Sequence, residues 1–160
     1  NENLPFSSVG WKKLSVKEVF SAIGIGILLS ILVPALSLFA GKIFPSPNEG
    51  TITALTTNYP WWILFLSVLT AGVTEEFFFR GYALERLLEL TGQKWLSGLI
   101  SLTFFVTIHA AGWNIAHIVG VVIPLGILLT LLYFWKRNLL FVIIVHTIID
   151  LPLIFMALFA

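Results

Sequence analysis

The sequence predicts an all-α protein: a polytopic transmembrane helix bundle with about five spans and a short amphipathic helix at the membrane interface. Two observations lead to this prediction. Of the 160 residues, 58% are hydrophobic and only 11% are charged, whereas a soluble domain carries about 25% charged residues. The hydrophobic residues also gather in five runs, each close to the roughly 20 residues that a helix needs to cross a bilayer.

The runs cover residues 19–40, 61–79, 95–111, 115–135 and 139–160. Pro34, Pro124 and Pro152 lie inside the first, fourth and fifth runs. Proline is tolerated in a spanning helix where neighbours satisfy the freed carbonyl, so we expect kinks and not breaks. Between the first two runs, residues 41–60 are rich in proline, glycine and asparagine, which is typical of an exposed loop.

Residues 81–94 differ from the spans because their pattern is amphipathic. Leu84, Leu87 and Leu88 share one helical face, whereas Glu85 and Glu89 lie largely off it. This pattern predicts a short helix at the cytoplasmic interface, ended by the glycine at position 92. A plain connecting loop is the alternative.

The basic residues indicate how the chain crosses the membrane. With five crossings, Lys42 falls on one side of the membrane, and the other lysines and arginines of the loops fall on the opposite side: Lys12, Lys13, Lys17, Arg86, Lys94, Lys136 and Arg137. Because loops rich in lysine and arginine stay in the cytoplasm, that side is predicted to be cytoplasmic. We therefore expect a cytoplasmic N-terminal segment, residues 1–18, and a transmembrane core, residues 19–160. The chain starts at Asn1 without a signal-peptide pattern, so we expect helices upstream of it to be missing.

Composition also limits the chemistry. The absence of cysteine excludes disulfides, thiolate metal sites and a cysteine nucleophile. A net charge of +1 without a basic stripe gives no indication of nucleic-acid binding. We expect the protein to lie in the lipid bilayer. Without cysteine, any hydrolytic chemistry would have to use carboxylate, imidazole or hydroxyl groups.

Two adjacent carboxylates and an arginine interrupt the second run. A charge at membrane depth costs about 3 kcal/mol or more, so these groups need partners or a function. Glu76 and Arg80 are four residues apart on a helix and are predicted to form a structural ion pair. Glu75 points about 100° away and lacks that partner, which suits it to general base catalysis. In the alternative interpretation, all three residues only bridge helices.

Further ionisable groups lie in the later runs. His109 follows Phe105 by four residues, so the two rings should stack on one helical face. His146 and Asp150 have the same spacing and are expected to face the bundle interior. A single buried histidine is more often a hydrogen-bonded core residue, but three helices that aim such groups inward favour a site. His117 is expected at the interface.

Together these residues carry a family resemblance. The patterns EExxxR (Glu75, Glu76, Arg80), FxxxH (Phe105, His109) and HxxxD (His146, Asp150) resemble, in this order, the motifs of the CPBP intramembrane proteases. This is the CAAX-protease and bacteriocin-processing (Abi) family, which includes the Ras-converting prenyl-protein endoprotease. The resemblance covers about residues 61–155 and includes the run FFFRGYALERLLE.

The resemblance implies an intramembrane endopeptidase that cleaves a membrane-associated peptide or prenylated protein without a cofactor. Glu75 with His109 would activate a water molecule, and His146 and Asp150 would stabilise the oxyanion. Position 150 is asparagine in the family members with the better-described mechanism. An ionised aspartate repels an oxyanion, so it helps only if it is protonated, orients His146 or binds a metal.

Two alternatives remain open. In a metal-dependent protease of the same fold, Glu75, His109, His146 and Asp150 would bind a divalent ion. A non-catalytic or proton-coupled membrane protein would also carry ionisable groups at membrane depth.

The predicted boundaries also conflict with the resemblance. They place Glu75 about 21 Å from the outer face and His109 about 21 Å from the inner face, at opposite depths. We favour the geometry that the resemblance implies over these boundaries.

Overall fold

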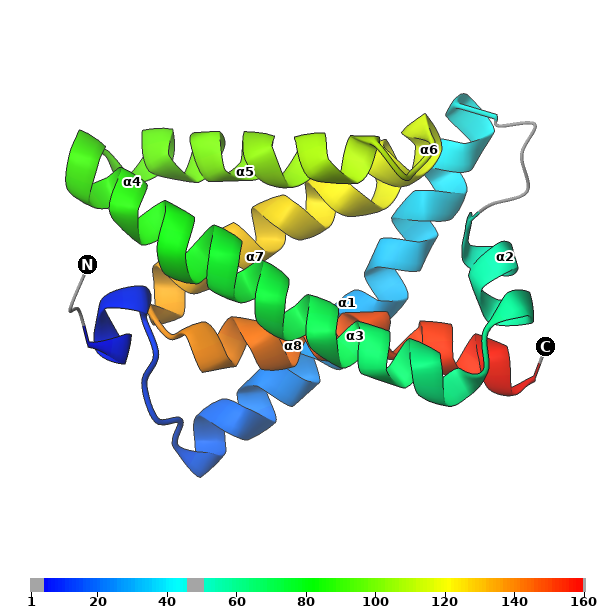
Figure 1. Cartoon of the computed structure of the whole chain (residues 1–160), viewed down its shortest axis with the longest axis horizontal. Helices are drawn as coiled ribbons and strands as arrows, with labels where there is room; N and C mark the ends of the chain where they lie inside the picture. Colours follow the sequence, from blue (N-terminus) through cyan, green and yellow to red (C-terminus); the bar gives the residue numbers. More distant parts are fainter. Residues whose placement is uncertain (1–4, 46–50, 160) are drawn as a thin grey trace.

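The computed structural model describes residues 5–45 and 51–159, and its regular structure in these ranges is entirely helical (Figure 1). The prediction of an all-α fold is therefore confirmed. The elements are the 3₁₀ turn η1 (Phe6–Val9), α1 (Val16–Ile43), α2 (Thr51–Asn58), α3 (Trp61–Glu76), the π-helical η2 (Phe77–Ala83), α4 (Leu84–Thr91), α5 (Lys94–Ala110), α6 (Ile115–His117), the π-helical η3 (Ile118–Val122), α7 (Ile123–Lys136) and α8 (Leu139–Leu158).

Four helical stretches among the described residues are long and apolar enough to cross a membrane: Val16–Ile43, Trp61–Thr91, Ile115–Lys136 and Leu139–Leu158. The chain is therefore a multi-pass integral membrane protein. The remaining predicted span is α5, which is apolar but shorter, at 17 residues. Its length of about 26 Å falls slightly short of the roughly 30 Å hydrocarbon core.

The second span and the amphipathic helix form one continuous helix, Trp61–Thr91. Figure 1 shows α3, η2 and α4 in line along it. The predicted amphipathic helix is thus present and ended by Gly92, but it is the last part of a longer helix and not a separate element. Gly81 does not interrupt the helix. A Cβ there would lie 3.0 Å from Leu139 and 3.2 Å from the Val9 carbonyl oxygen, so this glycine marks a close packing contact.

This continuity resolves the conflict in depth. Helix α5 runs back from the turn at Gly92 along α4 and η2 and diverges from the rest of α3 (Figure 1). At 1.5 Å per residue, Glu75 lies about 24 Å before Thr91, and His109 lies about 22 Å after Lys94. The two residues are therefore level with one another.

A buried polar contact fixes the far end of the long helix. The carboxylate of Glu85 accepts a hydrogen bond from the Tyr133 hydroxyl and another, of 2.8 Å, from Arg137. Tyr133 is fully buried, and Glu85 is nearly so. This contact ties α4 to the end of α7 and so holds the long helix against the bundle.

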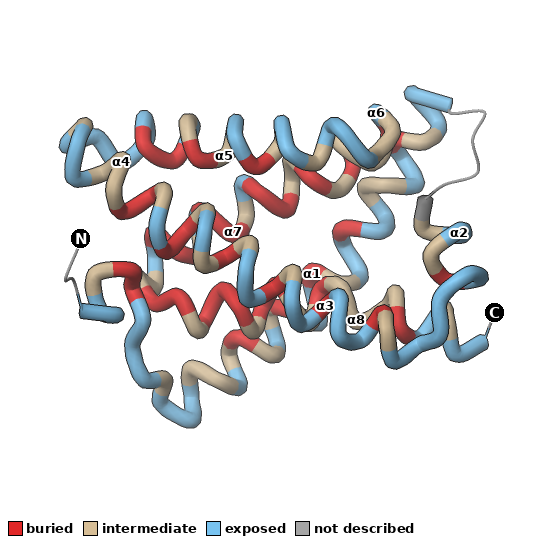
Figure 2. The backbone as a smooth tube through the Cα atoms, in the orientation of Figure 1, coloured by how far each residue is buried: buried red, intermediate tan, exposed pale blue. Residues whose placement is uncertain are grey.

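Helix α8 lies at the centre of the molecule, packed against α1, α3 and α7, and it is buried along much of its length (Figure 2). Its neighbours approach it at glycines. A Cβ at Gly26 of α1 would lie 2.7 Å from Ile148, and one at Gly72 of α3 would lie 2.4 Å from Thr147. Glycine allows such close contact between membrane helices. The contact at Gly72 brings the carboxylates at the end of α3 next to α8.

The prolines lie within helices, as predicted. Pro34 and Pro152 are inside α1 and α8, and neither helix is broken. Pro124 is at the start of α7, directly after the π-helical segment η3. Proline cannot donate the i to i−4 bond and its ring crowds that carbonyl, so the wider π turn accommodates it.

The predicted loop over residues 41–60 is only partly a loop. Helix α1 continues to Ile43, and α2 occupies Thr51–Asn58. Residues 46–50 lie outside the described residues.

Candidate active site

The two adjacent glutamates at the end of α3 have different surroundings. The side chain of Glu76 is completely buried, whereas that of Glu75 is 26% exposed. Neighbouring residues on a helix point about 100° apart, which separates the two carboxylates. The π-helical segment η2 begins at the next residue, and such segments occur often at functional sites.

Glu76 and Arg80 form a buried ion pair, with 2.7 Å between Glu76 Oε1 and an Arg80 terminal nitrogen. The other terminal nitrogen of Arg80 donates a 3.1 Å hydrogen bond to the carbonyl oxygen of Gly126 in α7. The guanidinium also lies 4.6 Å from the centre of the Phe105 ring in α5. Arg80 therefore joins three helices at the floor of the site.

The same oxygen of Glu76 lies 2.8 Å from Nδ1 of His146 in α8. The other ring nitrogen, Nε2, faces Asp150 at a distance of 3.4 Å from Oδ2. His146 is almost fully buried, whereas the Asp150 side chain is 32% exposed. A chain of ionisable groups thus runs from buried Arg80 through Glu76 and His146 to partly exposed Asp150.

Glu75 faces His109 of α5, with 3.6 Å between Glu75 Oε2 and His109 Nε2. His109 Nδ1 lies 2.8 Å from the carbonyl oxygen of Phe105, which can only accept, so Nδ1 carries the proton. In the neutral ring, Nε2 then has a free lone pair towards Glu75. The 3.6 Å separation is too long for a direct hydrogen bond, but both groups can accept a hydrogen bond from the same water molecule.

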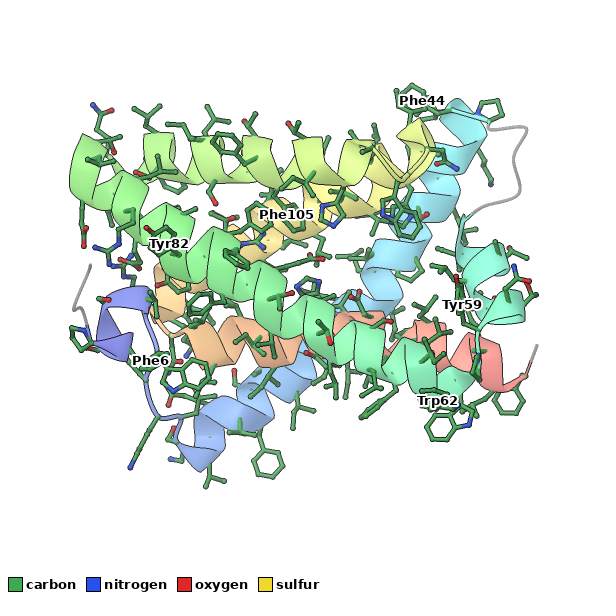
Figure 3. All side chains as sticks on the ribbon, viewed as in Figure 1. Phe6, Phe44, Tyr59, Trp62, Tyr82 and Phe105 are labelled. Atoms are coloured by element: carbon green, nitrogen blue, oxygen red, sulfur yellow. The ribbon has the colours of Figure 1, made fainter. Side chains whose placement is uncertain are left out.

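Phe105 supports this arrangement. Figure 3 labels Phe105 on the side of α5 that faces the long helix, where its ring meets Phe79 at 5.1 Å. The predicted stack with His109 is also present, with ring centres 4.4 Å apart. The phenyl ring thus contacts both the buried Arg80 guanidinium and the His109 imidazole.

All six predicted site residues come together from three helices. Glu75 also lies close enough to His146 and Asp150 for their charges to act on it. The cluster has a buried floor of Glu76, Arg80 and His146 and a partly exposed rim of Glu75, His109 and Asp150. A reactant could reach the rim but not the floor.

The interfacial position of His117 remains a prediction. His117 ends α6, stacks on Trp113 with 3.9 Å between ring centres, and lies within electrostatic range of His109 and Asp150. Over residues 5–45 and 51–159, no three histidine, aspartate or glutamate side chains are grouped so that they could hold one metal ion.

The sequence reasoning missed two features of the site. It did not anticipate that Glu76 contacts His146, because 70 residues separate them and no spacing rule connects α3 with α8. It also missed the Gly126 carbonyl as the second partner of Arg80. Helices α5 and α7 lie close together at Gly126, where a Cβ would be 2.6 Å from Leu102. This close contact, which indicates the importance of Gly126, is visible only once the fold is known.

The fold and the site define a polytopic helical membrane protein with carboxylates and histidines gathered in its interior. Residues 57–152 match the model of the family described as type II CAAX prenyl endopeptidase Rce1-like. The match covers more than half of the chain and all six site residues. The chain therefore belongs to the Rce1-like type II CAAX prenyl endopeptidase family, whose members are proteases. No curated protein and no solved structure matches the chain.

Proposed function

We propose that the chain is a metal-independent intramembrane endopeptidase in which Glu75 and His109 activate a water molecule. The observation that carries this proposal is the pairing of Glu75 with His109 at 3.6 Å, with His109 Nδ1 held by the Phe105 carbonyl. Both groups lie on the partly exposed rim of the cluster. They are therefore placed to accept hydrogen bonds from a water molecule beside a bound peptide, from which Glu75 can take one proton.

In the proposed reaction, Glu75 takes a proton from the water molecule while the water oxygen forms a bond to the peptide carbonyl carbon. The carbonyl oxygen becomes an oxyanion, which His146 Nε2–H stabilises. The C–N bond then breaks, and the proton passes from Glu75 to the leaving amine. One water molecule is consumed, and the products are a carboxylic acid and an amine.

The proposed substrate is a prenylated protein or another membrane-associated peptide, since the family is that of CAAX prenyl endopeptidases. We further propose that the loops rich in lysine and arginine, and the segment of residues 1–18, face the cytoplasm, following the positive-inside rule. The substrate peptide would then enter from the cytoplasmic side.

The test uses the whole chain in nanodiscs with a quenched fluorescent peptide that ends in a farnesylated CAAX sequence. We expect the wild type to cleave this peptide, also in excess chelator, and Glu75→Gln not to cleave it. Glu89→Gln is the matched control, because Glu89 is 59% exposed and lies on α4, away from the cluster. Cleavage by Glu75→Gln at the wild-type rate, or loss of wild-type cleavage in chelator, would refute the proposed mechanism.

A transporter or a non-catalytic scaffold would show a different result. Neither the wild type nor Glu75→Gln would then release a product from the farnesylated peptide or from an unprenylated one. A proteomic comparison of membranes that contain wild type or Glu75→Gln would extend the test to substrates of unknown sequence. The absence of any product that depends on Glu75 would refute the assignment as a protease.

A further inference from the structure

Glu76 differs from an ordinary buried ion-pair partner because one of its oxygens contacts two side chains, Arg80 and His146. Oε1 lies 2.7 Å from Arg80 and 2.8 Å from Nδ1 of His146. The side chain is completely buried, so it contacts neither solvent nor a substrate. An arginine alone would suffice for a structural pair. The second contact links this carboxylate to the rim of the site.

The two nitrogens of His146 are held unequally. Nδ1 lies 2.8 Å from the buried Glu76, whereas Nε2 lies 3.4 Å from the partly exposed Asp150. The first distance is that of a firm hydrogen bond to a charged group, and the second is longer than a well-formed one. Nδ1 is therefore the anchored nitrogen, and Nε2 is the one that can turn to another acceptor.

A carboxylate can only accept, so the proton of the first bond belongs to Nδ1. A neutral ring would then have a lone pair at Nε2 and could not donate to an oxyanion. The doubly protonated ring donates from both nitrogens, and the two carboxylates are placed to accept one hydrogen bond each. The four groups Arg80, Glu76, His146 and Asp150 then carry charges that sum to zero, as a buried network requires.

We infer that Glu76 is a positioning residue: it orients the His146 ring and keeps a proton on Nε2. This N–H can then donate its hydrogen bond to the oxyanion in place of Asp150. This inference rests on the proposed function. Arg80 completes the arrangement, because its second bond to the Gly126 carbonyl fixes the guanidinium that holds Glu76 in place. The orienting carboxylate of a Ser-His-Asp triad acts on its histidine in a comparable way.

Glu76→Gln tests the inference, because the amide keeps the shape of the side chain and loses its charge. We expect kcat to fall by about 10²- to 10⁴-fold, the range for general acid–base groups and for a triad's orienting carboxylate. KM should stay within about twofold, because no substrate reaches Glu76. The matched control is Glu85→Gln, which changes another buried glutamate. Glu85 lies on α4 and accepts hydrogen bonds from Tyr133 and Arg137. This variant should lower stability without a comparable loss in kcat.

A second measurement does not depend on cleavage. The chain has three histidines, so ¹⁵N NMR of histidine-labelled protein can be assigned with single-histidine variants. We expect both nitrogens of His146 to be protonated in the wild type and only one in Glu76→Gln. If Glu76→Gln does not fold, Glu76→Gln combined with Arg80→Met removes the opposing charge and allows the same comparison.

A wild-type His146 with one protonated nitrogen would overturn the inference, as would an unchanged kcat in folded Glu76→Gln. A loss in kcat no larger than that of Glu85→Gln would do the same, because the role would then be structural. If the wild type cleaves no peptide, the proposed function is refuted, and the NMR comparison still decides whether Glu76 controls the state of His146.

Discussion

Replacing Arg80 with alanine should destabilise the folded protein by about 3 kcal/mol. The change removes the 2.7 Å ion pair with Glu76, the 3.1 Å hydrogen bond to the Gly126 carbonyl and the contact with the Phe105 ring. It leaves the completely buried Glu76 with His146 as its one remaining cationic partner among the described residues. Arg80→Ala should therefore reduce the amount of folded protein in the membrane as well as activity.

The magnitude follows from burial. Removing one partner of a buried ion pair typically costs about 3 to 5 kcal/mol, because the other charge is left without compensation. His146 still neutralises part of that charge, which places the expected cost at the lower end. Arg86 provides the contrast: its own side chain is only 16% exposed, but its partner Glu89 is 59% exposed. Removing Arg86 leaves Glu89 in contact with the surroundings of the protein and not buried without compensation, so Arg86→Ala should cost clearly less than Arg80→Ala.

The assay is reversible unfolding in mixed micelles of increasing SDS content, followed by the fluorescence of the six tryptophans. Arg80→Ala, Arg86→Ala and Arg80→Met with Glu76→Gln would be compared with the wild type. The double variant should recover part of the loss, because no unpaired charge remains between these two positions. If Arg80→Ala is as stable as Arg86→Ala and merely inactive, Arg80 acts in catalysis and our division between floor and rim is wrong.

Three further predictions concern other positions. Glu75→Gln should fold normally and lose about 10²- to 10⁴-fold in cleavage rate, because an amide cannot take a proton from water. Asp150→Asn should retain or raise cleavage, because an amide N–H can donate to the oxyanion where an ionised carboxylate repels it. Gly120→Ala should cost about 1 to 3 kcal/mol in the SDS assay, because its Cβ would lie 2.7 Å from the Ser37 backbone in α1. Gly24→Ala is its control, since a Cβ there meets nothing within 4 Å.

Each of these predictions can fail in a defined way. Near-normal turnover by Glu75→Gln would show that Glu75 is not the base and would favour a metal-bound water as the nucleophile. A large loss in Asp150→Asn that added divalent metal restores would contradict the metal-independent mechanism. Equal stability of Gly120→Ala and Gly24→Ala would show that the contact between η3 and α1 is looser than the structure indicates.

The sequence was sufficient where a feature depends on local spacing. Four of the five apolar runs match helices within a few residues, whereas the helix of the second run continues to Thr91. The spacing of Glu76 and Arg80 predicted their contact because residues four apart face each other on a helix. The stack of Phe105 on His109 follows from the same rule. The approach of Glu75 to His109 did not follow from spacing; it came from the family resemblance, and the predicted boundaries argued against it.

The sequence was insufficient where packing decides. Gly81 resembled a boundary between two helices, but the helix continues through it. The glycine is there because Leu139 and the Val9 carbonyl leave no room for a side chain. The contact of Glu76 with His146 depends on how closely α3 approaches α8 at Gly72, and hydrophobic periodicity contains no such information. The α2 helix was missed because proline, glycine and asparagine around it suggested a loop throughout.

The equal lengths of the two helical stretches on either side of Gly92 have a consequence for evolution. Glu75 and His109 meet because the stretch from Glu75 to Thr91 is about as long as the stretch from Lys94 to His109. A deletion of one turn in either stretch would move one residue about 5.4 Å past the other. Relatives of this protein should therefore tolerate insertions and deletions here only in compensating pairs, while the turn between the helices varies freely. An alignment would then show a constant difference between the two lengths, even where neither length is constant.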